Sequence, residues 1–125
     1  MSAESAADIV GRLAHQYFWG WHDGNLEQLR ATLADDVEFE DPRLGQVSGA
    51  DAHVALYSGQ RRFAGLTGVA VRRQAHNEDV AFISYDVYLG QWRTVTVVDQ
   101  LSVRDGRITR VLSVSSEWPS RKPQT

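Results

Sequence analysis

The chain opens with an apolar stripe of helical period. The stripe residues recur every four positions and are Ile9, Leu13, Tyr17 and Trp21. This spacing predicts an amphipathic helix, which the turn signal of residues 23–24 ends. Asn25 is a favourable N-cap for a second helix. The apolar side of that second helix is expected to consist of Leu26, Leu29 and Leu33.

The period changes from helical to alternating over residues 37–42. Val37 and Phe39 alternate there with acidic residues, which predicts a short strand that Pro42 ends. Glycines at positions 45 and 49 are expected to flank a loop. A third helix is expected over about residues 51–58.

From Leu66 onward the pattern is typical of strands. The four predicted strand segments are residues 68–74, 78–89, 91–104 and 106–116. Turn signals separate them, and Asp105-Gly106 is a strong hairpin signal. Consecutive strands joined by short turns predict an antiparallel meander. Helices followed by such a sheet predict an α+β fold with the helices on one face, in a single domain spanning residues 1–125.

Composition excludes several classes of function. The 125 residues carry a net charge of −3, which does not suit a nucleic-acid partner. No apolar run approaches the length of a membrane span, and the N-terminus lacks the pattern of a signal peptide, so a cytoplasmic protein is expected. There is no cysteine, no metal-binding histidine spacing and no glycine-rich phosphate loop, so no cofactor is expected.

Asp99 is the residue that this pattern does not explain. It shares one face of its predicted strand with Val95, Val97, Leu101 and Val103. A lone buried carboxylate is unfavourable, so such a group finds a partner or stays protonated. One interpretation is a structural aspartate bonded to a backbone amide or to an arginine such as Arg93. The other is a functional acid.

Two segments carry a resemblance to a known family. They are DGNLEQLRATLADDVEFEDPRLGQVSGADAHVALY, residues 23–57, and VVDQLSVRDGRI, residues 97–108. Both resemble the ketosteroid isomerase and SnoaL-like polyketide cyclase branch of the nuclear transport factor 2-like superfamily, over nearly the whole chain from Ala7 to Glu117. The resemblance implies a cone-shaped, strongly curved antiparallel sheet, as in cystatin-like folds. Three helices would enclose a pocket with it, and a homodimer would form through the outer sheet face.

The resemblance also implies catalytic residues. Tyr17, Asp41 and Asp99 match the isomerase's phenol donor, its carboxylate base and its protonated carboxylic acid, and Tyr57 matches a tyrosine that supports the donor. That an apolar site keeps one carboxylic acid neutral is known from ketosteroid isomerase itself. Desolvation is expected to keep Asp99 neutral, whereas Asp41, beside a loop, is expected to keep more solvent and stay ionised. Tyr17 has the alternative of a core residue, and Asp41 that of a turn residue before Pro42.

Other positions depart from the isomerase pattern. Leu33 replaces a further tyrosine of the phenol network, and Ser113 and Ser115 replace apolar or aromatic lining. The pocket face of the strand over residues 80–88 is predicted to consist of Val80, Phe82, Ser84, Asp86 and Tyr88. Asp86 is unexpected there. It is interpreted as an additional acid or base or a partner for a ligand hydroxyl, or else as a residue that pairs with an arginine or faces a dimer interface.

Three functions remain open. The first is a cofactor-independent isomerase that moves a proton alpha to a carbonyl, with Tyr17, Asp41 and Asp99 at its centre. The second is a natural-product cyclase or epoxide-opening hydrolase in which Asp41, Asp86 and Asp99 share the acid, base and water-orienting roles. The third is a ligand-binding or dimerisation module without catalysis. The expected substrate is a hydrophobic to moderately polar small-molecule carbonyl compound.

Overall fold

The computed structural model describes residues 4–42, 45–57, 66–90 and 93–119, with side chains up to residue 116. The helices are α1 (Ala6–His22), α2 (Leu26–Thr32) and α3 (Ala50–Ala55). The strands are β1 (Leu33–Asp41), β2 (Gly45–Ser48), β3 (Leu66–His76), β4 (Val80–Leu89), β5 (Arg93–Arg104) and β6 (Arg107–Pro119). The third helix is shorter than predicted, and the predicted end of that helix at residue 58 lies outside the described residues. No helix of the described part is long and apolar enough to cross a membrane.

The described strands form one six-stranded sheet in the order β2-β1-β6-β5-β4-β3. The predicted meander is confirmed, because β3 pairs antiparallel with β4, β4 with β5, and β5 with β6. At the turn between β5 and β6, Asp105 and Gly106 both have positive φ, 52° and 72°, as a tight two-residue hairpin requires. On the other side of β6, β1 pairs with it in parallel, and β2 forms the edge of the sheet.

Two sequence predictions about the region of β1 are wrong. Residues 45–48 form strand β2 rather than a loop, and Phe39 pairs with Val47. Gly45 has a φ of 80°, which lets the chain enter β2 in a conformation that other residues rarely adopt. Leu33 opens β1 instead of ending α2, and its side chain is buried in the core. The hydrophobic pattern placed Leu33 in the helix because an apolar residue at this position suits both the apolar stripe of a helix and the start of a buried strand.

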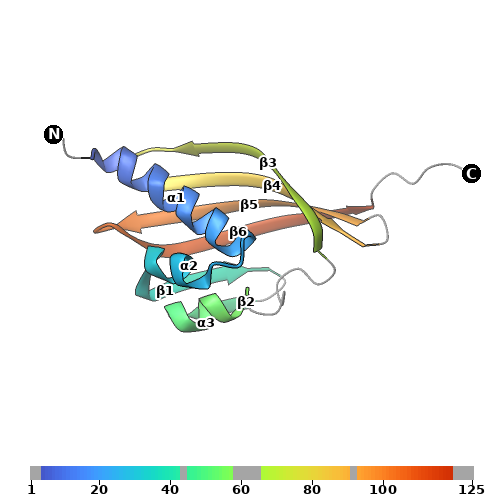
Figure 1. The fold of residues 1–125 in the computed structure, drawn as a ribbon, viewed down its shortest axis with the longest axis horizontal. Coiled ribbons are helices and arrows are strands. Elements are labelled where there is room, and N and C mark those ends of the chain that lie inside the picture. The colour runs from blue at the N-terminus through green and yellow to red at the C-terminus, as the bar shows by residue number, and fades with distance from the viewer. Residues whose placement is uncertain (1–3, 43–44, 58–65, 91–92, 120–125) are drawn as a thin grey trace, which may run out of the picture.

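All three helices lie on one face of the sheet, as predicted (Figure 1). The long α1 crosses in front of the meander strands, while α2 and α3 lie beside β1 and β2 (Figure 1). The buried apolar residues of helices and sheet meet between these layers in one cluster. The architecture is therefore the predicted α+β arrangement, and the covered face of the sheet is its inner face.

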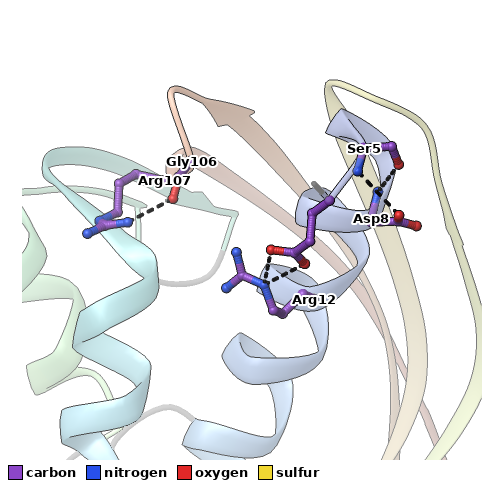
Figure 2. Close-up of polar contacts among 6 residues, drawn as sticks. Ser5, Asp8, Arg12, Gly106 and Arg107 are labelled. Atoms are coloured by element: carbon purple, nitrogen blue, oxygen red, sulfur yellow. Dashed lines mark hydrogen bonds and ion pairs between the residues drawn. The ribbon is translucent and has the colours of Figure 1, made fainter. Parts of the chain in front are cut away.

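The start of α1 is set by a capping box. The Ser5 hydroxyl accepts a hydrogen bond from the backbone N–H of Asp8 at 3.0 Å, and the Asp8 carboxylate accepts one from the Ser5 N–H at 3.3 Å (Figure 2). Nearby, the Arg12 guanidinium binds the Glu4 carboxylate at 3.0 Å. The helix ends at His22, and Gly24 then has a φ of 73°, which confirms the predicted stop.

The short helices are tied to their neighbours by packing and by an exposed ion network. Gly20 of α1 is buried, and a Cβ at this position would lie 3.0 Å from the backbone nitrogen of Leu29 in α2. Arg30 of α2 donates to Asp51 of α3 at 3.0 Å and to Asp35 of β1 at 3.3 Å. The hydrogen bond to Asp51, more than any other contact, raises the pKa of Arg30. The network is exposed, so its role is to orient α2 and α3 rather than to supply much stability.

Candidate functional site

A row of polar side chains crosses the inner face of the sheet. Asp99 of β5 pairs with Ser113 of β6. Glu40 of β1 pairs in parallel with Leu112, so the next residues along both strands, Asp41 and Ser113, lie side by side. Asp41, Ser113 and Asp99 are all buried, with exposed fractions of 1%, 0% and 1%. Since neighbouring strands lie about 4.8 Å apart, the two aspartate backbones are separated by about 10 Å, with Ser113 between them.

Asp99 is buried, as the alternation of its strand predicted, and it has an identified partner. The Tyr85 hydroxyl of β4 donates a hydrogen bond to Asp99 Oδ2 at 2.8 Å. The Tyr85 ring packs against Phe18 and Trp21 of α1, with centroid distances of 5.1 Å and 5.6 Å. Helix α1 thus holds the Tyr85 ring in place, and the Tyr85 hydroxyl in turn orients the Asp99 carboxyl group.

Tyr17 forms the second polar centre, between α1 and α3. Its hydroxyl lies 2.8 Å from His53 Nε2 and 2.9 Å from the Tyr57 hydroxyl. His53 and Tyr57 are four residues apart, so both point from the same side of α3 and its C-terminal extension. Tyr17 and His53 are completely buried. The contact between Tyr17 and Tyr57 agrees with the role that the resemblance implies for Tyr57.

Aromatic rings connect the two centres. Trp21 stacks on Tyr57 with a centroid distance of 5.5 Å, and it also contacts Tyr85. The His53 ring meets Phe39 edge to face at 4.9 Å, and Phe39 precedes Asp41 by two residues on the same strand face. Tyr17, Asp41 and Asp99 therefore all belong to the buried layer between helices and sheet. Joint contact of the three with a single ligand oxygen stays a prediction.

The predicted pocket face of β4 is wrong. The inner face consists of the odd-numbered residues Ala81, Ile83, Tyr85, Val87 and Leu89. The even-numbered residues, Val80, Phe82, Ser84, Asp86 and Tyr88, lie on the opposite, outer face, where Phe82 and Tyr88 are 43% and 41% exposed. The outer face also carries the large side chains of Phe82 and Tyr88, which made it resemble a pocket face although it includes Ser84 and Asp86. Ser113 and Ser115 of β6 do face inward, and Ser115 is half-buried.

Asp86 does not belong to the buried layer. Its Oδ2 atom pairs with Arg72 of β3 at 3.0 Å, and its Oδ1 atom accepts a hydrogen bond from Thr96 of β5 at 2.8 Å. The interpretation of Asp86 as a residue that pairs with an arginine is thus the correct one. A role in acid–base chemistry beside Asp41 and Asp99 is excluded by its position on the outer face.

The expected solvation of Asp41 is also wrong. Asp41 was expected to keep solvent at the strand end, but it is as buried as Asp99. It shares the inward parity of Val37 and Phe39, and β2 pairs with β1 as far as Asp41 itself. The two carboxyl groups therefore do not differ in burial, and any difference in their roles must come from their hydrogen-bond partners.

Sequence reasoning missed two residues of this site, His53 and Tyr85. The signal for His53 was its spacing of four residues from Tyr57, which places both side chains on one helix face. The signal for Tyr85 was the set of residues 81, 83, 87 and 89, which is uniformly apolar and thus a better inner face than its counterpart. Unlike the buried His53, the two histidines of α1, His15 and His22, are exposed. His22 pairs with Asp23 at 2.9 Å.

An open depression of about 1300 Å³ lies at the other end of the sheet, around the β5–β6 hairpin and the start of α1. It is lined by residues of both charges, among them Asp36, Glu38, Arg104 and Arg107. Arg107 donates to the carbonyl oxygen of Gly106 at 2.9 Å (Figure 2). Tyr17, Asp41 and Asp99 do not line this depression. The predicted pocket around those three residues stays a prediction.

The fold and the buried layer define a class: an α+β protein whose helices cover one face of an open, mostly antiparallel sheet, with phenols and carboxyl groups in between. Residues 14–111 match the sequence profile of the SnoaL-like domain. The chain belongs to this family. No curated protein is significantly similar to the chain in sequence.

Solved structures have the same fold. A proposed ketosteroid isomerase of Kribbella flavida is 24% identical, with a TM-score of 0.81 over 98% of this chain and 88% of that protein. An NTF-2 like protein of unknown function from Burkholderia xenovorans is 18% identical, with a TM-score of 0.75 over 93% of this chain and 88% of the other. An LEH-like epoxide hydrolase of M. tuberculosis is 19% identical, with a TM-score of 0.71 over 90% and 86%. At these identities the likeness shows the fold alone.

Proposed function

We propose that the protein is a cofactor-independent isomerase that moves a proton from the α carbon to the γ carbon of a β,γ-unsaturated ketone, so that the double bond moves to the α,β position. Asp41 takes the proton from the carbon alpha to the carbonyl and returns it to the gamma carbon. Tyr17 and a neutral Asp99 donate hydrogen bonds to the carbonyl oxygen. One observation carries this proposal: Asp41, Asp99 and Tyr17 are all completely or almost completely buried in the same layer.

The chemistry explains why such a set is useful. Removal of the proton leaves an enolate, whose negative charge gathers on the former carbonyl oxygen. Donors aimed at that oxygen stabilise the transition state more than the ground state, because their hydrogen bonds strengthen as the charge develops. In a water-excluded layer these bonds are stronger than in water. A carboxylate is then an adequate base, since the donors make the carbon acid stronger.

We assign Asp99 the role of the neutral acid. The Tyr85 hydroxyl donates to Oδ2 of Asp99, and in this proposal Asp99 gives a proton from Oδ1 to the carbonyl oxygen. Asp41 and Asp99 lie in one row of the buried sheet face, with Ser113 between them.

The test is an assay with a β,γ-unsaturated ketone, followed as the absorbance of the conjugated product. Asp41→Asn is expected to lower kcat by about 10²–10⁴-fold, because an amide cannot accept the proton. Tyr17→Phe removes an oxyanion donor and is expected to lower kcat by about 10²–10³-fold. Asp99→Asn keeps a donor and is expected to retain part of the activity. Asp86→Asn, on the outer face, is the matched control and should leave kcat unchanged.

Equal activity of the Asp41→Asn and Asp99→Asn variants would contradict the division of roles. The ¹³C carboxyl signal of Asp99 offers an independent measurement, since protonated and ionised carboxyl groups differ in chemical shift. We expect the shift of a protonated acid at neutral pH. A signal of an ionised Asp99 together with a protonated Asp41 would reverse the two roles.

Epoxide opening or cyclisation is the second candidate, and the buried Ser113 between the two aspartates favours it. A hydroxyl beside two carboxyl groups suits the orientation of a water molecule. Asp86 has no part in this version, because it lies on the outer face. Hydrolysis of a small epoxide, with no isomerisation of the ketone, would select this candidate. Binding of either compound without turnover would select a non-catalytic binding module.

A further inference from the structure

The Tyr17 hydroxyl has a hydrogen-bonding constraint that its two neighbours must resolve. A phenol has one proton to donate, and its oxygen accepts up to two further hydrogen bonds. His53 Nε2 and the Tyr57 hydroxyl lie 2.8 Å and 2.9 Å from this oxygen. If Tyr17 gives its proton to either neighbour, it has none for a ligand. If it gives its proton to a ligand oxygen, any bond to these neighbours must be donated by them.

The two neighbours differ in how they meet this requirement. The Tyr57 hydroxyl can rotate to donate or accept, so it imposes no direction. A neutral imidazole carries its proton on one nitrogen only, and the protonated nitrogen donates while the other accepts. His53 therefore decides the direction: with the proton on Nε2 it donates to Tyr17, and with the proton on Nδ1 it takes the Tyr17 proton.

We propose that His53 is a positioning residue that carries its proton on Nε2 and thereby directs the Tyr17 proton toward the ligand oxygen. This inference rests on the proposed function, since it assumes that Tyr17 is an oxyanion donor. His53 would not touch the substrate, and it acts only through Tyr17.

Burial and packing support a single, fixed state of His53. The side chain is completely buried, and a charged imidazole is disfavoured in such surroundings. The ring lies edge to face against Phe39 at 4.9 Å and against Tyr17 at 5.6 Å, so it is held from two sides. A ring held in this way keeps Nε2 on the Tyr17 oxygen, which leaves the tautomer as the variable that sets the direction of the hydrogen bond.

Nuclear magnetic resonance tests the tautomer without any ligand. Protein labelled with ¹⁵N-histidine, with the exposed His15, His22 and His76 each replaced by glutamine, shows the imidazole of His53 alone. The long-range ¹H–¹⁵N pattern distinguishes a protonated Nε2 from a protonated Nδ1. We expect a neutral ring protonated on Nε2. A ring protonated only on Nδ1 would overturn the proposal.

Binding of an oxyanion tests the consequence. The probe is 4-nitrophenolate, whose absorbance reports binding. His53→Leu removes the donor and is expected to weaken binding about tenfold, which corresponds to about 1.4 kcal/mol. His53→Gln keeps an amide that can donate from a similar distance, so its affinity should stay within about threefold of the parent protein. His15→Gln is the control for an exposed histidine. If both His53 variants weaken 4-nitrophenolate binding equally, the role of His53 is merely structural and the proposal is overturned. If neither variant changes binding, the proposal is overturned as well.

The outcomes separate this inference from the proposed function. A protonated Nε2 in a protein that isomerises no ketone would leave the inference about Tyr17 standing and reject the isomerase. Isomerase activity in a protein whose His53 is protonated on Nδ1 would support the isomerase and reject the inference about His53. If the leucine variant does not fold, judged by circular dichroism, the tautomer and the glutamine variant decide.

Discussion

Tyr85 and Asp99 show how a buried carboxyl group is accommodated in this protein. The phenol donates to Oδ2 at 2.8 Å, and its ring is held by Phe18 and Trp21 of the covering helix. A buried acceptor that loses its donor retains the full penalty of desolvation. The position of Asp99 on an apolar face thus depends on a side chain from the neighbouring strand.

Replacement of Tyr85 by phenylalanine is therefore expected to lower stability while it keeps the ring contacts. The expected loss is about 1–3 kcal/mol of the free energy of unfolding, measured by urea denaturation at neutral pH. Tyr88→Phe is the matched control, because Tyr88 is 41% exposed on the same strand, and its effect should stay within about 0.5 kcal/mol. A Tyr85→Phe variant as stable as the control would show that the hydrogen bond to Asp99 contributes nothing net.

At the scale of elements, the position of α1 over the sheet depends on how closely α2 approaches it. Gly20 is a point of close approach, because a Cβ there would lie 3.0 Å from the Leu29 nitrogen and 3.2 Å from the Leu29 Cα. Tyr17, Phe18 and Trp21, which build the site, surround this point on α1. A displacement of α1 would consequently move the site side chains.

Gly20→Ala is expected to destabilise the protein by about 1–3 kcal/mol, since the contact is with the backbone of α2, which cannot move away without a shift of the helix. Gly11→Ala is the matched control on the same helix. There the three atoms nearest to a Cβ all belong to the ring of the exposed His76, with Cε1 at 2.8 Å, and that side chain can move. The control should be neutral or more stable by up to about 1 kcal/mol, because alanine favours a helix. Thermal denaturation of both variants measures the difference, and equal effects would contradict the close-approach argument.

At the scale of the whole molecule, the outer face of the sheet carries apolar side chains that none of the three described helices covers. The exposed large residues on this face are Phe82, Tyr88, Val98 and Val114. Val98 and Val114 are paired neighbours on β5 and β6, so part of the set forms a contiguous patch. Exposed apolar patches of this kind are typical of protein–protein contacts.

We predict that this patch is a homodimer interface, as the family resemblance implies. Sedimentation is then expected to yield about twice the chain mass of 14.0 kDa. Val114→Glu places a charge at a residue that is 52% exposed, and it should shift the protein to the monomer without loss of fold, because an unpaired charge is unfavourable in an apolar contact. Glu27→Lys on α2, away from this face, is the charge-changing control. A parent protein that sediments as a monomer would remove the dimer and leave the fold intact.

The features that the sequence alone determined are those set by local period. The four-residue stripe of α1, the turns of the meander and the inward position of Asp99 each follow from residues close together in the chain. The positions of Tyr17, Asp41 and Asp99 in the chain were matched by resemblance, and the structure buries all three. Their catalytic roles remain proposals that the experiments above test.

Tertiary structure decided what depends on contacts between distant segments. Alternation reveals that a strand has two faces, but it identifies the inner face only when the faces differ in polarity. In β4 the outer face is partly apolar too, which reduces the contrast, and the covering by α1 selects the face of Tyr85 rather than that of Phe82 and Asp86. Asp41 is buried on the inner face of β1, a strand that pairs with β2 and β6, and His53 reaches Tyr17 because α3 packs on β1. These pairings join residues far apart in the chain, and the free energy that selects them comes from burial of both partners together, so neither partner's local sequence specifies it.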